Sequence, residues 1–161
     1  MSRPIALRSV VDGDELFLAD VYGSTREDEL AVTDWTAEQK RAFCRMQFDA
    51  QTAHYRKHYL RAEYFIIECN DCPVGRLYID RSAREIRIMD ITVLPEHRGK
   101  GIGTRLLSDL QKEAKQCGKI VSIHVERMNP ALRLYQRIGF QMAEDKGVYL
   151  LMEWKPTAGL T

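Results

Sequence analysis

The chain has 161 residues, of which 45% are hydrophobic and 29% charged, and these values are ordinary for one globular domain. Its 24 Lys and Arg nearly balance its 23 Asp and Glu, which argues against a dedicated nucleic-acid or anionic-membrane binder. No stretch reaches the roughly 18 apolar residues of a membrane span, and the N-terminal sequence lacks the apolar run of a signal peptide. The four cysteines are too few and too unevenly spaced for a secreted disulfide scaffold. We therefore expect a cytoplasmic protein in which residues 1–161 form a single domain.

The first third of the chain predicts one strand followed by two helices. Ile5–Val10 has the composition of a strand. Asp12, with a glutamate three residues later, is typical of a helix N-cap, so a short helix to about Tyr22 is expected. The polar segment Ser24–Asp34 predicts a loop. Thr36–Lys57 opens with a Thr and Gln capping box and continues with apolar residues at helical spacing, which predicts a long amphipathic helix.

The rest of the chain alternates strand-like and helical patterns. Two helices are predicted, Ile102–Cys117 and Pro130–Arg137, each followed by a glycine. The order of all these elements predicts a mixed α/β fold with one central sheet. The expected strands of this part are Tyr64–Glu68, Val74–Asp80, Glu85–Val93, Ile120–Val125, Phe140–Asp145 and Val148–Trp154.

The most informative segment joins a predicted strand to a predicted amphipathic helix. Gly99, Gly101 and Gly103 stand at alternate positions immediately before and within the start of that helix. Glycines let successive backbone N–H groups turn toward one point, and a helix N-terminus adds partial positive charge. Arg98 and Lys100 add formal positive charge. The segment therefore indicates a pyrophosphate cradle, although a glycine-rich turn that only starts a helix has the same glycine spacing.

Two sequence landmarks resemble one known family. The order and spacing of the residues in the loop exclude a Walker A motif and the dinucleotide fingerprint. Arg98-Gly99-Lys100-Gly101-Ile102-Gly103 resembles the acetyl-CoA loop of the GNAT superfamily of N-acetyltransferases, Arg/Gln-x-x-Gly-x-Gly/Ala, at every defined position. Asn129 to Phe140 resembles the family's second landmark, Asn…Ala…Leu-Tyr…Gly-Phe. The resemblance runs from Ile5 to Trp154 and implies a mixed, mostly antiparallel central sheet flanked by helices.

The resemblance also implies acetyl-CoA as cosubstrate and assigns its contacts. Backbone groups of Ile91 and Val93, with Thr92 between them, would pair with the pantetheine arm. Asn129 would face the cofactor, but it stands six residues before Tyr135 where the family usually has seven, and Met128 occupies the usual position. The pyrophosphate would be held by the loop residues Arg98, Gly99, Lys100, Gly101, Ile102, Gly103 and Thr104.

Tyr135 matches the family tyrosine that is placed to protonate the departing thiolate. Its helical spacing from Ala131 is equally typical of a packed amphipathic tyrosine. A general base must accept a proton from the attacking amine, because an amine of high pKa arrives protonated.

The candidate bases lie on two predicted strands. On the strand after the predicted helix Ile102–Cys117, the residues Ser122, His124 and Glu126 share one face. His124 falls nearest to a position where some family members place a base, followed by Glu126 and then by Glu85 on the preceding strand. Each of these side chains could equally be a solvated strand residue or a salt-bridge partner.

A metal site has some support from residue count alone. Cys69 and Cys72 have the spacing of a zinc knuckle, and His54 and His58 lie one helical turn apart. However, Asn70-Asp71 before a proline is also typical of a tight connection between strands, and the resembled family needs no metal. We expect no metal.

The resemblance implies transfer of an acetyl group from acetyl-CoA to a primary amine of a small molecule or protein, by direct attack in a ternary complex. The alternative function is a catalytically silent acyl-CoA sensor or partner-binding module. Nucleic acid and membrane are not expected partners, and homodimers are common enough in the family to make a homodimer an expectation.

Overall fold

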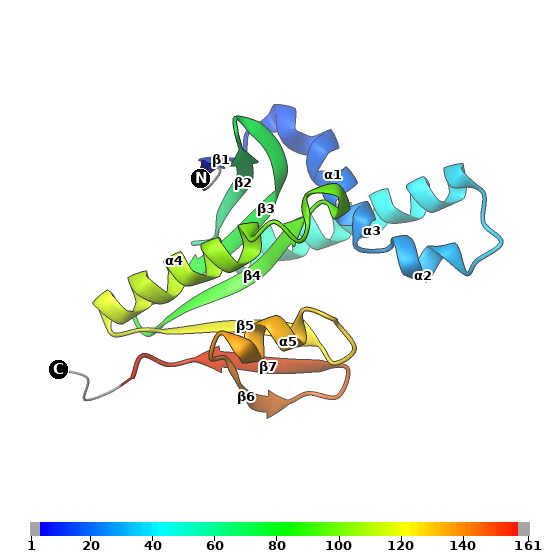
Figure 1. Cartoon of the computed structure of the whole chain (residues 1–161). Coiled ribbons are helices and arrows are strands. Elements are labelled where there is room, and N and C mark those ends of the chain that lie inside the picture. Colours follow the sequence, from blue (N-terminus) through cyan, green and yellow to red (C-terminus); the bar gives the residue numbers. More distant parts are fainter. Residues whose placement is uncertain (1–3, 158–161) are drawn as a thin grey trace. The chain divides into compact units, whose positions relative to one another are not determined.

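The computed structural model describes residues 4–157, and all the predicted helices and strands are present in the predicted order (Figure 1). The strands are β1 (Ile5–Ser9), β2 (Glu63–Cys69), β3 (Cys72–Arg81), β4 (Glu85–Val93), β5 (Ile120–Glu126), β6 (Gln141–Asp145) and β7 (Tyr149–Trp154). The α-helices are α1 (Glu15–Ser24), α2 (Glu27–Ala31), α3 (Ala37–His58), α4 (Ile102–Cys117) and α5 (Leu132–Arg137), and the short 3₁₀ helices are η1 (Asp12–Asp14) and η2 (Pro95–His97).

The strands form one sheet in the order β1-β2-β3-β4-β5-β7-β6. β4 and β5 pair in parallel, from Glu85 opposite Ile120 to Ile88 opposite Ile123. The pairs β1–β2, β5–β7 and β6–β7 are antiparallel. The predicted mixed, mostly antiparallel sheet flanked by helices is thus confirmed.

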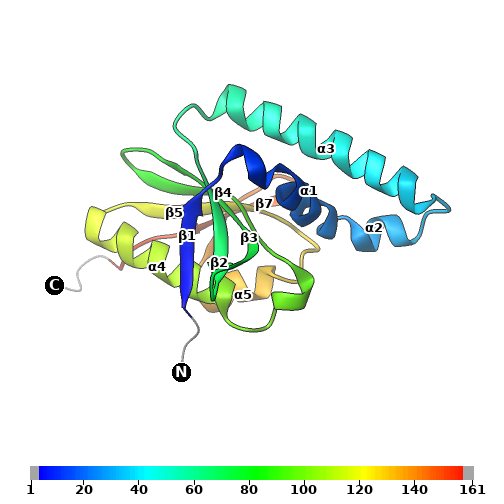
Figure 2. The same ribbon diagram turned by 90° about the horizontal axis from the view of Figure 1, so that it is seen from above.

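The chain divides into two compact units, one built from segments 1–78 and 91–100 and the other from segments 79–90 and 101–161. The division falls inside β3, inside β4 and within the glycine loop, so each of these segments contributes to both units. In the first unit α1 lies against α3 (Figure 2). Leu18 and Val21 of α1 and Phe48 of α3 are buried there, together with Ile66 of β2 and Leu77 of β3.

The second unit has its own apolar core. α4 buries one face because its leucines and an alanine recur at helical spacing, and α4 contacts β5. The side of β5 that carries Val121, Ile123 and Val125 is buried. The α4 residues that contribute to this core are Ile102, Leu106, Leu107, Leu110 and Ala114.

Two predictions for the N-terminal segment are wrong. Residues 24–34 are not a loop throughout, because α2 forms within them: Leu30 is buried, and Arg26 pairs with Glu29 across one helical turn at 2.8 Å. Asp12 is not the N-cap of α1. The residue before α1 is Asp14, whose carboxylate is buried and accepts hydrogen bonds from Arg8 and from the backbone N–H of Val11.

The connection between β2 and β3 confirms the predicted tight turn. Asn70 and Asp71 have φ of 53° and 65°, the left-handed conformation that two-residue hairpin turns require and that Asn and Asp tolerate best after glycine. The turn is shorter than expected, and β3 begins already at Cys72.

Candidate active site

The glycine loop ends in a helix start that has no cap from a side chain. Gly99 and Gly101 have φ of 75° and 82°, a left-handed conformation that costs other residues strain. Gly101 is the N-cap of α4, and the first turn of α4 carries no acidic residue. Helix geometry leaves the N–H groups of the first turn without intrahelical partners. These N–H groups and the helix dipole together suit an anion.

Gly103 is the loop position whose glycine the fold itself does not require. It lies in the first turn of α4, and a Cβ at this position would meet no heavy atom within 4 Å among the described residues. A glycine in a helix costs about 0.5–1 kcal/mol relative to alanine. The missing side chain therefore leaves open space above the first turn at a cost in stability.

The end of β4 is held closely by β3. A Cβ on Gly75 would lie 2.1 Å from the carbonyl oxygen of Thr92, so only glycine permits this approach of the two strands. Leu94 N–H donates to Val74 O at 2.8 Å, and Arg98 Nε donates to Val93 O at 2.9 Å. Segment 91–93 and the loop arginine are thus fixed to their neighbours. The parallel pairing of β4 with β5 ends at Ile88 and Ile123, whereas β4 continues to Val93.

Tyr135 lies in the core of the second unit and is 6% exposed. Its ring packs edge-on against Phe140, with 5.7 Å between ring centroids. Burial raises the pKa of the Tyr135 phenol to about 12, and the negative charge of Asp90 contributes to the rise. The residue is therefore packed, as the amphipathic interpretation expects, and its O–H also keeps its proton at neutral pH.

Asn129 has a local structural role in the turn before α5. Its Oδ1 accepts a hydrogen bond from the backbone N–H of Ala131 at 2.9 Å, and its own N–H donates to Glu126 O. The side chain is exposed. Because Oδ1 is engaged by Ala131, the side-chain amide nitrogen of Asn129 is the group that can bind another partner.

His124 lies between two cations. Arg87 Nη1 is 3.3 Å from His124 Nδ1, and Lys146 Nζ is 3.2 Å from His124 Nε2. Burial lowers the pKa of His124 below its usual 6.5, and the charges of Arg87 and Lys146 lower it further. A neutral imidazole has one acceptor nitrogen and one N–H, so it accepts a hydrogen bond from only one of these cations at a time.

Glu85 joins the same network. Its carboxylate accepts a hydrogen bond from Ser122 Oγ at 2.6 Å and lies 3.6 Å from the Arg87 guanidinium, which in turn donates to Ser122 Oγ at 2.7 Å. The structure therefore brings two predicted bases, Glu85 and His124, to one arginine. Glu126 is exposed, and the Tyr149 hydroxyl lies 3.4 Å from its carboxylate.

Lys146 is the member of this network that sequence reasoning missed. It lies in the turn between β6 and β7, whose position opposite His124 depends on strand register and not on a local motif. Ser122 could have been found, because strand alternation already placed it on the same face as His124.

The four residues of the candidate zinc set lie on three elements, α3, β2 and β3. His54 and His58 are neighbours on α3, with 4.5 Å between their ring centroids, and Cys69 and Cys72 flank the β2–β3 turn. Within residues 4–157, no three or more His, Cys, Asp or Glu side chains form a group that could hold a metal ion. In the same range no helix has both the length and the apolar character needed to cross a bilayer. The absence of a metal stays a prediction.

The protein has a mixed sheet, and the middle strand of that sheet leads into a glycine-rich helix start that no side chain caps. This arrangement defines an α/β protein suited to a phosphate-bearing cofactor. The model of the Acetyltransferase (GNAT) family matches residues 29–140, which is more than half of the 161 residues. The chain belongs to the GNAT acetyltransferase family.

Curated relatives match parts of the chain. The L-amino acid N-acyltransferase MnaT of Escherichia coli (strain K12) is 48% identical over 52 residues, which are 31% of this chain and 30% of that protein. An uncharacterized N-acetyltransferase of Methanocaldococcus jannaschii is 37% identical over 90 residues, 50% of this chain and 40% of that protein. The chain thus spans less than half the length of these relatives.

A solved structure matches over nearly the whole fold. The PaiA N-acetyltransferase of Thermoplasma acidophilum, in complex with coenzyme A, has a TM-score of 0.71 at 20% identity. The match covers 94% of this chain and 99% of that chain. At this identity the likeness shows the fold.

Proposed function

We propose that this protein is an acetyl-CoA-dependent N-acetyltransferase that moves an acetyl group to a primary amine by direct attack in a ternary complex. The observation that carries the proposal is the start of α4. It has no side-chain cap and no acidic residue in its first turn, and a Cβ at Gly101 or Gly103 would meet no heavy atom within 4 Å among the described residues, so the site is open to a ligand that approaches the backbone closely. The pyrophosphate of acetyl-CoA is such a ligand, because it is an anion that suits the N–H groups of a first helical turn.

The proposed cofactor contacts follow the chain from β4 into α4. Backbone groups of Ile91, Thr92 and Val93 would pair with the pantetheine arm. Of these, Val93 has its carbonyl engaged by the Arg98 side chain. Asn129 would contribute its side-chain amide nitrogen. The pyrophosphate would be held by Arg98, Gly99, Lys100, Gly101, Ile102, Gly103 and Thr104.

Tyr135 is the proposed donor to the leaving sulfur. Acetyl-CoA, when bound, supplies an activated thioester. Complete proton transfer from a phenol with a pKa of about 12 to an ordinary thiolate, whose pKa is near 8.5, would cost about 5 kcal/mol. We therefore propose that the Tyr135 O–H stabilises the developing thiolate by a hydrogen bond, and that the final protonation follows from elsewhere.

The acceptor amine needs a base, and we rank His124 before Glu126 and Glu85. The lowered pKa of His124 keeps it neutral at pH 7, as a base must be. Its engagement with Arg87 and Lys146 means that one of these contacts has to open before an amine can be deprotonated. Glu85 is already satisfied by Ser122 and Arg87.

The remaining parts of the proposal concern acceptor and context. The acceptor is a primary amine, and L-amino acids are included because a curated relative is named for them. Residues 1–161 form one N-acetyltransferase domain. A cytoplasmic location and a homodimer are also proposed, and cell fractionation and light scattering test them.

The sharpest test of the cradle is Gly103→Asp, because its effects on folding and on binding differ. A carboxylate in the first turn of a helix interacts favourably with the helix dipole, while its negative charge repels the pyrophosphate and weakens acetyl-CoA binding at least about tenfold in calorimetry. Gly103→Ala is the matched control, since the family loop accepts alanine at this position, and its affinity should be unchanged. Unchanged affinity in folded Gly103→Asp would remove the cradle.

Transfer is tested separately from binding. Thiol release from acetyl-CoA is measured with a panel of primary amines that includes L-amino acids and polyamines. Release that depends on an added amine supports the transferase. Tight acetyl-CoA binding without turnover on any amine contradicts it and supports the sensor function instead.

A further inference from the structure

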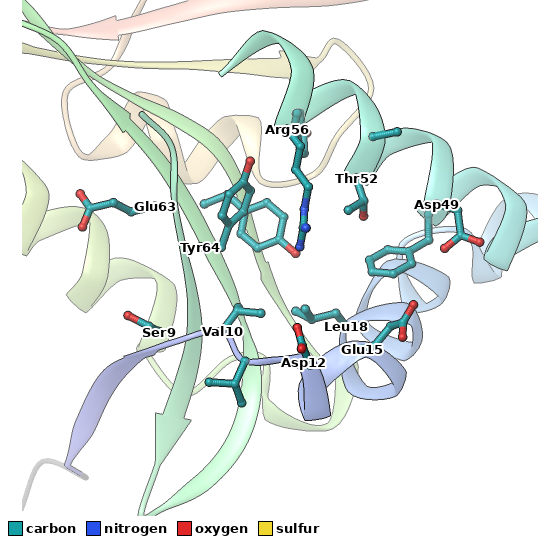
Figure 3. A pocket seen from close by; sticks show the side chains of 15 residues that line it. Ser9, Val10, Asp12, Glu15, Leu18, Asp49, Thr52, Arg56, Glu63 and Tyr64 are labelled. Carbon is teal, nitrogen blue, oxygen red and sulfur yellow. The ribbon is translucent and has the colours of Figure 1, made fainter. Parts of the chain in front are cut away.

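A cavity of about 650 Å³ opens in the first unit, among η1, α1, α3, β2 and β3 (Figure 3). All residues that line it lie between Ser9 and Tyr78, so none belongs to β4 or to the glycine loop. Its volume is within the range of cavities that bind small molecules. The proposed transfer of an acetyl group does not use it.

Most of its inner surface is apolar or aromatic. Leu18, Phe48 and Tyr78 are each at most 5% exposed, and Val10 adds an aliphatic side chain. The rings of Tyr64 and Tyr78 meet edge-to-face, with 4.8 Å between centroids. This surface suits an apolar body of moderate size.

Two opposite charges face this space from different elements. Figure 3 shows Arg56 extending from α3 toward the centre of the cavity and Asp12 lying on the other side, next to Leu18. Within residues 4–157, neither Arg56 nor Asp12 makes an ion pair or a side-chain hydrogen bond. Both side chains are exposed to solvent, so each could bind a ligand group without a new burial of charge.

The other carboxylates that line the cavity are not free to bind a ligand as Asp12 is. Glu15 and Asp49 both pair with Arg45, and the distance from Arg45 Nε to Asp49 is 3.1 Å. Glu63 points away from Arg56 and Tyr64 in Figure 3. The charges left for a ligand are therefore one cation and one anion, which come from different elements.

We propose that this cavity binds a zwitterionic ligand whose ammonium and carboxylate are separated by an apolar body, as in a short apolar peptide. Arg56 binds the carboxylate, because a guanidinium matches two carboxylate oxygens, and Asp12 binds the ammonium. A ligand with a single charge would satisfy only one of these groups. A free α-amino acid carries its ammonium and its carboxylate on one carbon and has no apolar body between them, so we expect it to bind more weakly.

None of the residues assigned to the proposed acetyl transfer lines this cavity, and we infer that its ligand is not the acceptor amine. An amine that is paired with Asp12 keeps its proton and is no nucleophile, so the ligand is bound intact. The proposal consequently does not depend on acetyl transfer, and binding is its only readout.

Calorimetry with the dipeptide Leu-Leu tests the site on the full chain, with and without saturating coenzyme A. Saturable binding is expected in both conditions. Arg56→Gln and Asp12→Asn should each weaken it at least about tenfold, as should acetylation of the peptide's amine or amidation of its carboxylate. The matched controls Arg61→Gln and Asp20→Asn change exposed residues of the same charge that do not line the cavity, and they should leave affinity unchanged.

Four outcomes would overturn the proposal. The first three are the absence of saturable binding of Leu-Leu up to about 5 mM, equal binding of the blocked peptides, and equal loss of affinity in the control variants. The fourth is binding of leucine alone as tightly as Leu-Leu, which would show that the inferred separation of charges is wrong. Circular dichroism of Arg56→Gln and Asp12→Asn confirms folding, which both exposed positions should preserve.

Discussion

Tyr135 has a packing role, which belongs to its ring, and a proposed chemical role, which belongs to its hydroxyl oxygen. Its ring fills space against Phe140, whereas its O–H is the group that would face the leaving thiolate. Tyr135→Phe keeps the ring and removes only the O–H. Affinity for acetyl-CoA should survive, and kcat should fall by roughly 100- to 1,000-fold, the range that one hydrogen-bond donor to a developing negative charge supplies.

The pH dependence of this variant distinguishes donor from base. With a pKa of about 12, the Tyr135 phenol stays protonated throughout the usual assay range, so the defect should not be rescued by raising pH to about 9. Steady-state kinetics from pH 6 to 9 measures this. Full kcat in Tyr135→Phe with the true acceptor would exclude the hydrogen bond to sulfur.

His124 is kept neutral by its surroundings, and this can be measured directly. Burial, Arg87 and Lys146 lower its pKa, whereas Glu144 and Glu85 oppose the shift. NMR titration should therefore give a midpoint below 6.5 in the wild type. Lys146→Gln removes one cation and should raise the midpoint toward 6.5. Lys115→Gln, an exposed lysine of α4, serves as control.

The same shift has a consequence for stability with a definite sign. Between the lowered pKa and 6.5 the unfolded chain binds more protons at this histidine than the native chain does, so the contribution of His124 to stability increases with pH through that window. Below the lowered pKa, the protonated His124 destabilises the native state to the full extent of the pKa shift. A wild-type midpoint at or above 6.5, or one that Lys146→Gln leaves in place, would contradict the arrangement of charges around His124.

At the scale of elements, the approach of β3 to β4 depends on Gly75. A Cβ there would lie 2.1 Å from the Thr92 carbonyl oxygen, a backbone atom that cannot move independently of β4. Gly75→Ala should therefore lower the free energy of unfolding by about 1–3 kcal/mol or more. Because Thr92 is a proposed pantetheine residue, acetyl-CoA affinity should fall as well.

Urea denaturation checks this prediction. Gly23→Ala in α1 is the control, because its added methyl group meets no heavy atom within 4 Å and alanine favours a helix. It should keep or raise stability. If Gly75→Ala unfolds at the same urea concentration as the wild type, the strand approach is not tight in solution.

Elements with a long, regular pattern were predictable from the sequence, and short ones were not. The helix α3 was recognisable from its capping box, in which Thr36 and Gln39 exchange hydrogen bonds. α4 was recognisable from its apolar face and its terminal glycine. α2 has five residues, fewer than two helical turns, and it is held by the burial of Leu30. Such a helix leaves no periodicity to read.

In the candidate site too, the parts with a local sequence pattern were predictable and the parts that depend on strand pairing were not. The loop from Arg98 to Thr104 was predictable because its glycines carry a local backbone requirement. The setting of His124 was not, because it depends on which residues of β7 and of the β6–β7 turn lie opposite β5. The pairing of β6 with β7 also shifts register between Met142 and Glu144, and no local pattern in the sequence indicates that shift.

At the scale of the whole molecule, the proposed single domain makes a prediction about cooperativity. β3 and β4 each continue from one compact unit into the other, so unfolding either unit would remove strand residues that the other needs. The chain has two tryptophans, of which Trp35 lies in the first unit and Trp154 in the second. Trp35→Phe and Trp154→Phe therefore each leave one fluorescent reporter, and the two variants report on different units.

Both reporters should show the same thermal midpoint, and that midpoint should agree with circular dichroism of the same variant. Acetyl-CoA at about 100 times its Kd stabilises the native state by about 2.7 kcal/mol, which corresponds to roughly 5–10 °C for a chain of this size. Because β3 and β4 continue from one unit into the other, the two reporters should move together. Two outcomes would show that the two units unfold as separate domains. One is a difference of more than about 5 °C between the thermal midpoints of the two reporters. The other is a response to acetyl-CoA in only one reporter.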